Sequence, residues 1–138
     1  MMSDQEIFKV FSVEYDNTYD IIRATFIHTV SFDEDNTRMA QLFQERLLSF
    51  FEKHPEKMFD VLVDTKQIHY DEHTVTKEAR DIYQDLFNHE QTGRVAIVAG
   101  AGTFSFLTKF VVSLFMKKKK TQFFIDPTKA VVWLDSDR

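Results

Sequence analysis

The amino-acid sequence predicts an α/β fold, with a mixed, mostly parallel sheet and an N-terminal hairpin. The main observation is the segment from Arg94 to Ile125, RVAIVAGAGTFSFLTKFVVSLFMKKKKTQFFI. It has the pattern of a buried strand, a glycine-containing turn, an almost wholly apolar helix, four lysines and another buried strand. Strand–helix–strand crossovers are the units of parallel sheets. The second observation is the alternation of strand and helix patterns along the chain, which gives the order β-β-α-β-α-β-α-β-α.

The N-terminal part of the sequence predicts a hairpin. Residues 11–15 (FSVEY) alternate apolar and polar side chains, as a strand with one solvated face does. The turn cluster DNTYD follows at 16–20, and residues 21–30 (IIRATFIHTV) are expected to return as the second strand. His28 would share one face of that strand with Phe26 and Val30, because side chains alternate. We therefore expect His28 to be a hydrogen-bonded core or edge histidine rather than a catalyst.

Two amphipathic helices and a strand are expected next. Ser31 and Glu34 have capping-box spacing, and the helix after them should end near His54, because Pro55 restricts the residue before it. Residues 59–64 (FDVLVD) predict a short apolar strand. A second helix is expected to end before Gly93. Its apolar stripe consists of Val75, Ala79, Ile82, Tyr83, Leu86 and Phe87.

The C-terminal part completes the sheet. Residues 95–98 are apolar on both faces, as expected of a central parallel strand. After the apolar helix at 104–116, residues 122–125 predict the last strand. Asp126 and Pro127 supply an N-cap and a first-turn proline for a final helix that runs through Leu134. No linker or repeat is visible, so residues 1–138 are expected to form a single domain.

Composition limits the class of protein. The 138 residues contain no cysteine, which excludes a disulfide framework, thiol catalysis and cysteine-bound zinc. The first ten residues lack the pattern of a secretory signal, and the apolar stretch at 104–116 is too short to span a bilayer. We therefore predict a cytoplasmic protein. The 15 phenylalanines predict an aromatic core, and the alternative is that some of the rings line an apolar ligand pocket.

Charge is unevenly distributed. Residues 1–93 carry 9 basic and 19 acidic side chains, a net charge of −10, whereas residues 94–138 carry 8 and 3, a net charge of +5. This asymmetry indicates an interaction surface for an acidic partner, a membrane surface or a second copy of the chain, which would make a homodimer. It argues against nucleic acid, because an acidic domain with one short lysine run lacks the usual basic footprint.

The order of elements, with the segments FDVLVD, RVAIVAG, TQFFID and AVVWL, resembles the SpoIIAA-like branch of the STAS-type proteins. Anti-sigma-factor antagonists and the cytosolic tails of sulfate transporters share this fold. The resemblance covers about residues 8 to 134, as a pattern rather than a diagnostic motif. It implies a mixed sheet with helices packed against it, and a binding or regulatory module without catalysis of its own.

The resemblance also points to a phospho-acceptor. In the antagonists a strand ends in an Asp-Ser pair that opens a helix, and a partner kinase phosphorylates the serine. The matching pair here is Asp64-Thr65, which makes Thr65 the candidate. The sequence departs from the pattern, because TKQIHYDEH separates the pair from the next helix and the usual glycine is missing. The alternative is a loop threonine that follows a strand.

The turn after residue 98 is the candidate ligand site. A strand, a Gly-Ala-Gly-Thr turn and a helix are the right context for an anion held by backbone N–H groups. The dinucleotide fingerprint and the Walker lysine are both absent, so a tight strand-to-helix turn is the alternative. We expect a protein partner or a small apolar or anionic ligand near residues 100–106. The candidate contacts are Gly100, Gly102, Thr103, Ser105 and Phe106.

The lysine run is a second candidate surface. Lys117, Lys118, Lys119 and Lys120 follow the apolar helix at 104–116. Cations favour a helix C-terminus, so a solvated turn is one explanation. The functional alternative is peripheral binding to lipid or an anionic membrane, or contact with an acidic partner, through this helix and the lysines.

One motif has metal-ligand spacing. His69, Glu72 and His73 match the H-x-x-E-H pattern of a zinc hydrolase. The motif lies between a strand end and a helix start, whereas zinc chemistry needs both histidines on a formed helix and a third ligand. We therefore expect a solvated loop, no metal, no cofactor and no catalysis.

Overall fold

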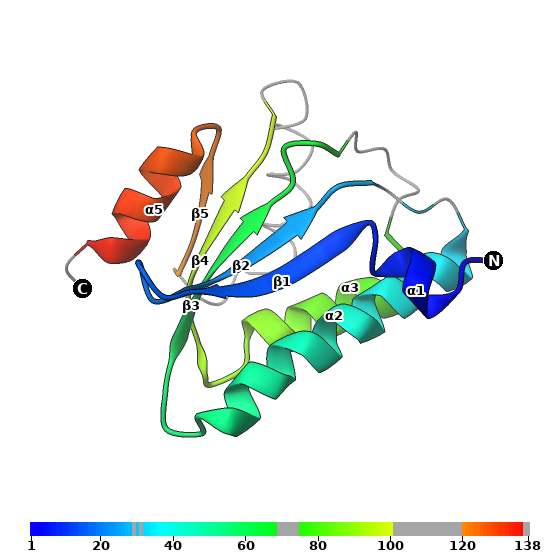
Figure 1. The fold of residues 1–138 in the computed structure, drawn as a ribbon, viewed down its shortest axis with the longest axis horizontal. Helices are drawn as coiled ribbons and strands as arrows, with labels where there is room; N and C mark the ends of the chain where they lie inside the picture. The colour runs from blue at the N-terminus through cyan, green and yellow to red at the C-terminus, as the bar shows by residue number, and fades with distance from the viewer. Residues whose placement is uncertain (29, 31, 69–74, 101–119, 137–138) are drawn as a thin grey trace.

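The computed structural model describes residues 1–28, 30, 32–68, 75–100 and 120–136. A twisted five-stranded sheet has helices on both of its faces (Figure 1). The described elements, in chain order, are α1 (Asp4–Ile7), β1 (Phe11–Asp16), β2 (Ile21–Phe26), α2 (Asp33–Lys53), β3 (Phe59–Asp64), α3 (Lys77–Phe87), β4 (Thr92–Val98), β5 (Thr121–Phe124) and α5 (Pro127–Asp135).

The strands lie in the order β1-β2-β3-β4-β5. β1 pairs with β2 in antiparallel orientation, as a hairpin, and every later neighbour is parallel. A parallel pair needs a long crossover connection, which α2 supplies between β2 and β3 and α3 supplies between β3 and β4. The predicted fold class is confirmed: the sheet is mixed and mostly parallel, with an N-terminal hairpin.

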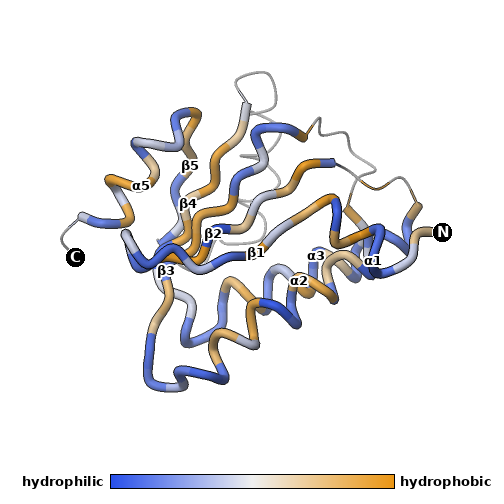
Figure 2. The backbone as a smooth tube through the Cα atoms, in the orientation of Figure 1, coloured by the Kyte–Doolittle hydropathy of each residue, from blue (hydrophilic) through white to orange (hydrophobic). Residues whose placement is uncertain are grey.

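The sheet separates two apolar layers. The larger core lies between the sheet and the helices α1, α2 and α3, and the smaller one lies under α5 on the opposite face. The pattern of apolar residues explains why the sheet has a core on each face. Figure 2 shows that apolar residues dominate β4, whereas along α2 they alternate with polar ones. A central strand is buried on both faces, and a surface helix on only one.

Phenylalanine fills the larger core, as predicted. Phe43 is fully buried, and its ring centre lies 5.3 Å from that of Phe26. Phe51 and Phe59 stack at 5.7 Å at the other end of α2. Aromatic rings at such separations add to the stabilisation that their buried area already supplies.

Several boundaries differ from the prediction. The helix α1 was not predicted, because it has only four residues. α2 begins at Asp33 with Phe32 as its N-cap and without a side-chain cap, so the predicted capping box of Ser31 and Glu34 is wrong. β2 ends at Phe26, and His28 is exposed rather than part of a core or edge strand. The physical reason is that the chain before Phe11 turns away into α1, with the Val10 N–H bonded to the Ile7 carbonyl, so the pairing of the two strands stops after the bond from Ile27 N–H to the Val10 carbonyl.

The later boundaries shift by a few residues. Val75 precedes α3, whose N-cap is Thr76. The helix ends at Phe87, before Gly93 as predicted, and Gly93 lies inside β4. Ile125 is outside β5 and 49% exposed. Two predictions are confirmed closely: the strand at 59–64 has its predicted ends, and Asp126 caps α5 by accepting a hydrogen bond from the Thr128 N–H at 2.9 Å.

Candidate functional site at the carboxyl edge of the sheet

The carboxyl ends of four strands meet at one edge of the sheet. Thr25 of β2 lies beside Asp64 of β3, Asp64 lies beside Val98 of β4, and Val98 lies beside Phe124 of β5. Crossover helices run opposite to the strands, so α2 and α3 begin at this same edge. Ligands of open α/β sheets bind outside the carboxyl ends of the strands. Gly100 follows β4 and therefore also belongs to this edge.

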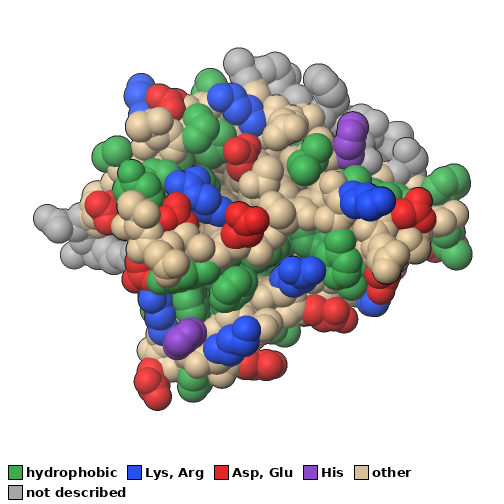
Figure 3. Space-filling view, in the orientation of Figure 1, with side chains coloured by type: hydrophobic (Ala, Val, Ile, Leu, Met, Phe, Trp, Pro, Cys, Tyr) green, Lys and Arg blue, Asp and Glu red, His purple; other side chains and the backbone are tan. Residues whose placement is uncertain are grey.

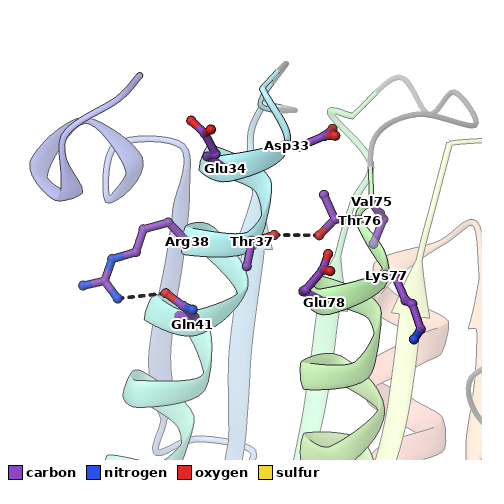
Figure 4. A pocket seen from close by; sticks show the side chains of 9 residues that line it. All are labelled: Asp33, Glu34, Thr37, Arg38, Gln41, Val75, Thr76, Lys77 and Glu78. Atoms are coloured by element: carbon purple, nitrogen blue, oxygen red, sulfur yellow. Dashed lines mark hydrogen bonds between the residues drawn. The ribbon is translucent and has the colours of Figure 1, made fainter.

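A shallow groove of about 670 Å³ lies between the first turns of α2 and α3 (Figure 4). Two contacts hold the helices together here. The Thr37 and Thr76 hydroxyls are hydrogen-bonded at 2.8 Å, and the Asn36 side-chain oxygen accepts the Thr76 N–H at 2.9 Å. Two hydrogen bonds between α2 and α3 therefore lie within the groove. Its lining residues are Asp33, Glu34, Thr37, Arg38, Gln41, Val75, Thr76, Lys77 and Glu78.

The lining of the groove carries three carboxylates and two cations. Arg38 is already engaged: its Nε and Nη2 donate to the two carboxylate oxygens of Asp4 at 3.0 and 2.8 Å, and its Nη1 donates to Gln41 at 3.1 Å. The hydrogen bond from Arg38 lowers the pKa of Asp4 below its ordinary value, since it stabilises the ionised carboxylate. Figure 4 shows Arg38 pointing away from α3, and Lys77 on the α3 side of the groove. This part of the edge is suited to polar contacts with a ligand or a partner chain.

Thr65 lies directly beyond β3 at the same edge. Its hydroxyl donates to the Val98 carbonyl at 2.7 Å, and its N–H donates to the same oxygen at 2.8 Å. The residue is 3% exposed. Phosphorylation of Thr65 stays a prediction, and it would require this hydroxyl to leave its carbonyl partner and reach solvent.

Most of the other predicted site residues lie outside the described residues. This applies to Gly102, Thr103, Ser105 and Phe106 of the candidate ligand turn, to the helix at 104–116, and to Lys117, Lys118 and Lys119. The pattern of His69, Glu72 and His73 is outside them as well. Within the described ranges, no three histidine, aspartate or glutamate side chains are grouped so that they could hold a metal ion.

Lys120 lies at the opposite edge of the sheet from Gly100. Its carbonyl accepts the Val95 N–H at 2.9 Å, its Nζ is 3.4 Å from the Thr92 carbonyl, and β5 begins at the next residue. Lys120 therefore marks the amino ends of β4 and β5, whereas Gly100 follows the carboxyl end of β4. The two predicted surfaces begin at opposite ends of one strand, so Lys120 and Gly100 do not contribute to a single compact site.

The face seen in Figure 3 has acidic and basic side chains interspersed over its described part. Neither sign forms a continuous patch in this view. On this face, the charge asymmetry between the two parts of the sequence therefore does not produce a surface of a single charge.

The sequence did not predict the groove, although it contained the capping signal at the start of α3, which forms one side of the groove. Thr76 precedes an amphipathic segment and accepts the Ala79 N–H at 3.0 Å as an N-cap. Its hydroxyl contact with Thr37 joins residues 39 positions apart in the chain. No periodicity in the sequence reports a contact of that separation.

Comparison with known proteins supports the fold. A solved structure of an uncharacterised protein from Shewanella loihica PV-4, of the DUF3478 family, has a SpoIIAA-like fold. It superimposes with a TM-score of 0.56 over 90% of this chain and 91% of that chain. This chain has a SpoIIAA-like fold. The resemblance predicted from the sequence is thereby confirmed, and the 18% sequence identity supports the shared fold and nothing finer.

No protein-family model matches the chain, and no curated protein matches it either. Among the residues that the structure describes, no helix has both the length and the apolar character needed to cross a membrane.

Proposed function

We propose that this SpoIIAA-like domain is a non-catalytic binding or regulatory module. It engages a protein partner, or a small apolar or anionic ligand, at the carboxyl edge of the sheet near residues 100–106. The observation that carries the proposal is the meeting of four strand ends, the first turns of two helices and the groove at one edge.

The architecture suits recognition. The sheet ties Thr65 to the end of β4, because the Thr65 hydroxyl and N–H both donate to the Val98 carbonyl. The groove adds hydroxyl groups and side chains of both charges from α2 and α3. A protein partner can use such mixed polar contacts at the rim. The Gly-Ala-Gly-Thr sequence that begins at Gly100 is the part of the proposed site expected to suit an anion.

Native mass spectrometry of the freshly purified protein, compared with its denatured mass, tests the proposal. A retained ligand would appear as an extra mass in the native spectrum. In the variant Gly102→Trp the ligand should be lost, because a bulky side chain at the turn would occupy the space of the ligand. The matched control is Asn17→Trp, in the exposed hairpin turn at the opposite edge, which should keep the ligand.

A ligand that is retained equally by both tryptophan variants would contradict the placement. If the protein carries no extra mass, the same two variants are compared for complex formation with an identified partner chain. Binding that survives Gly102→Trp unchanged would again place the site elsewhere.

The membrane alternative is separated by a second measurement. Pelleting with anionic phospholipid vesicles at low salt, weakened by salt and by replacing Lys117–Lys120 with glutamine, would favour peripheral membrane binding through 104–120. An absence of pelleting at low salt would remove that alternative.

A further inference from the structure

Asp35 is a buried carboxylate with one unused oxygen. It lies in the first turn of α2 and is 3% exposed. Its Oδ1 accepts the Met2 N–H at 2.9 Å, whereas its Oδ2 has no hydrogen-bond partner among the described residues. A buried polar atom without a partner is costly, and native structures contain few such atoms. The second oxygen is therefore an exception that calls for a physical explanation.

The charge of Asp35 also lacks a nearby cation. None of the ion pairs that join described residues includes Asp35, and the Arg38 guanidinium, three residues later on α2, is engaged by Asp4 and Gln41. The N-terminus of α2 supplies partial positive charge. One neutral N–H and a helix terminus compensate only in part for removing a carboxylate from water. The position that faces Oδ1 is therefore suited to a positively charged donor.

The fold places the Met2 nitrogen at this position. Ser3 is the N-cap of α1: its hydroxyl accepts the Glu6 N–H at 3.2 Å, and its own N–H donates to Glu6 Oε1 at 2.9 Å. The Met2 side chain packs against the larger core, whereas Met1 is 85% exposed. The capping box and this packing hold the Met2 nitrogen against Asp35 without any contribution from Met1.

We propose that the mature chain begins at Met2, and that the α-ammonium group of Met2 pairs with the buried Asp35 carboxylate. Loss of Met1, and of anything that precedes it, replaces an amide with one N–H by an ammonium with three. A small rotation of the carboxylate then brings Oδ2 to a second N–H of the same group. A hydrogen bond between charged groups is roughly twice as strong as a neutral one, so the pair strengthens the attachment of residues 2–8 to α2.

Two routes give the same amino group. In the first, an aminopeptidase hydrolyses the Met1–Met2 peptide bond: the oxygen of water ends on the Met1 carboxylate, and the Met2 amine takes up a proton. In the second, translation starts at the second methionine. The variant Met2→Leu separates them, because leucine keeps an apolar side chain and removes the second start. A chain that still loses Met1 in this variant is hydrolysed, and a chain that keeps Met1 owes its normal start to translation.

The first measurement is the intact mass and the N-terminal peptide of the untagged protein, purified from its source organism. We expect a chain that lacks Met1 and carries an unmodified amino group on Met2. A chain that begins at Met1 or at an earlier residue would overturn the proposal.

The second measurement compares amide exchange in two full chains, one beginning at Met1 and one at Met2, each released from a removable tag. The Ile7 amide, which donates to the Ser3 carbonyl, should exchange about tenfold more slowly in the chain that begins at Met2, because its amino group binds a charged partner. Acetylation of that amino group, or Asp35→Asn, should abolish the difference. Asp33→Asn, at an exposed position of the same helical turn, is the matched control and should preserve it.

A third measurement reports on the ion pair itself. Only the unprotonated amine is acylated, and pairing with a buried carboxylate disfavours loss of the proton. In the chain that begins at Met2, an amine-reactive ester near neutral pH should therefore label the α-amino group more slowly than in the same chain with Asp35→Asn. The exposed Lys129 is the internal reference for reagent activity.

Three further results would overturn the proposal. The first is equal protection of Ile7 in the chains that begin at Met1 and at Met2. The second is a gain in protection that survives acetylation or Asp35→Asn, or that Asp33→Asn abolishes equally. The third is an α-amino group that is acylated at the same rate with aspartate and with asparagine at position 35.

Discussion

At Gly93 the close approach of two strands leaves no room for a side chain. A Cβ atom at this position would lie 2.4 Å from Asp60 Oδ1 and 3.2 Å from the Phe59 carbonyl. The Asp60 carboxylate is held there, because Oδ1 also accepts the Arg94 N–H at 2.8 Å. Steric space, rather than an unusual backbone angle, explains the glycine.

We predict that Gly93→Ala lowers the free energy of unfolding by about 1–3 kcal/mol, since overpacking forces atoms to shift in a well-packed core. Urea denaturation monitored by circular dichroism measures the effect. Gln122→Ala, at an exposed position of β5, is the control and should change stability little. Equal stability of Gly93→Ala and the wild type would show that Asp60 moves aside at no cost.

Single residues also show why the sequence did not predict the whole structure. The Gln91 side-chain nitrogen lies within 3.1 Å of the carbonyls of Phe51, His54 and Lys57, where it closes the C-terminal end of α2. Those carbonyls are 34 to 40 positions away. Residue type and spacing do not identify a hydrogen-bond partner so distant in the sequence. A polar residue before a strand, such as Gln91, is therefore interpreted from the sequence only as part of a turn.

At the scale of elements, hydrophobic periodicity predicted the strands and long helices well, and helix starts less well. The segment 59–64 is apolar throughout and became β3 with the predicted ends. The start of α2 was misplaced, because the local capping signal at Ser31 does not decide where the helix begins. The short helix α1 has no period to detect, although its Ser3 and Glu6 form a capping box.

A substitution at the N-terminus of α2 should increase the stability of the protein. Phe32 occupies the N-cap and is 64% exposed, and its side chain makes no capping hydrogen bond. Replacing it with serine supplies an acceptor for one of the unpaired N–H groups, so Phe32→Ser should raise the free energy of unfolding by about 1 kcal/mol. Thermal unfolding of this variant is compared with Met58→Ser, an exposed methionine outside any helix, which should show no such gain. A loss of stability would mean that the Phe32 ring makes a contact that outweighs the cap.

Acid should weaken the packing of residues 1–8 against α2. Hydrogen bonds lower the pKa of Asp4, through Arg38, and that of Glu6, through Ser3. Because both pKa values are depressed in the folded protein, their contribution is present above the ordinary carboxyl values of about 4 and is lost as pH falls through the lower, folded-state values. Glu45 also faces Arg38, and the buried Asp35 accepts the Met2 N–H.

We therefore expect protection factors at Ile7 and Phe8, corrected for intrinsic exchange, to fall between pH 5 and pH 3 before the core amides lose protection. Asp4→Asn should lower these protection factors already at neutral pH and make them depend less on pH. If the Ile7 and Phe8 amides stay protected until the whole chain unfolds, the buried Ile7 side chain, rather than the carboxylates, holds this segment against α2.

At the scale of the whole molecule, the sheet separates the two predicted functional surfaces. Gly100 follows the carboxyl end of β4, and Lys120 lies at its amino end, packed against the Thr92 carbonyl. Both surfaces lie within one 32-residue segment of the sequence. Their separation follows from the crossover that the sequence predicted, because a crossover returns the chain to the opposite edge before the next parallel strand. The α/β order was readable from local patterns, whereas the meeting of α2 and α3 at the groove depends on packing between distant segments.

The central claim is that binding takes place at the carboxyl edge of the sheet. Site-specific photo-crosslinking in cells of the source organism tests it most directly, with the photoreactive amino acid placed at residue 102 in one variant and at residue 17, in the opposite hairpin turn, in another. The account predicts a discrete covalent adduct, visible as one added mass, from position 102 and none from position 17. An adduct from position 17 alone, equal labelling at both positions, or no adduct from position 102 would contradict it.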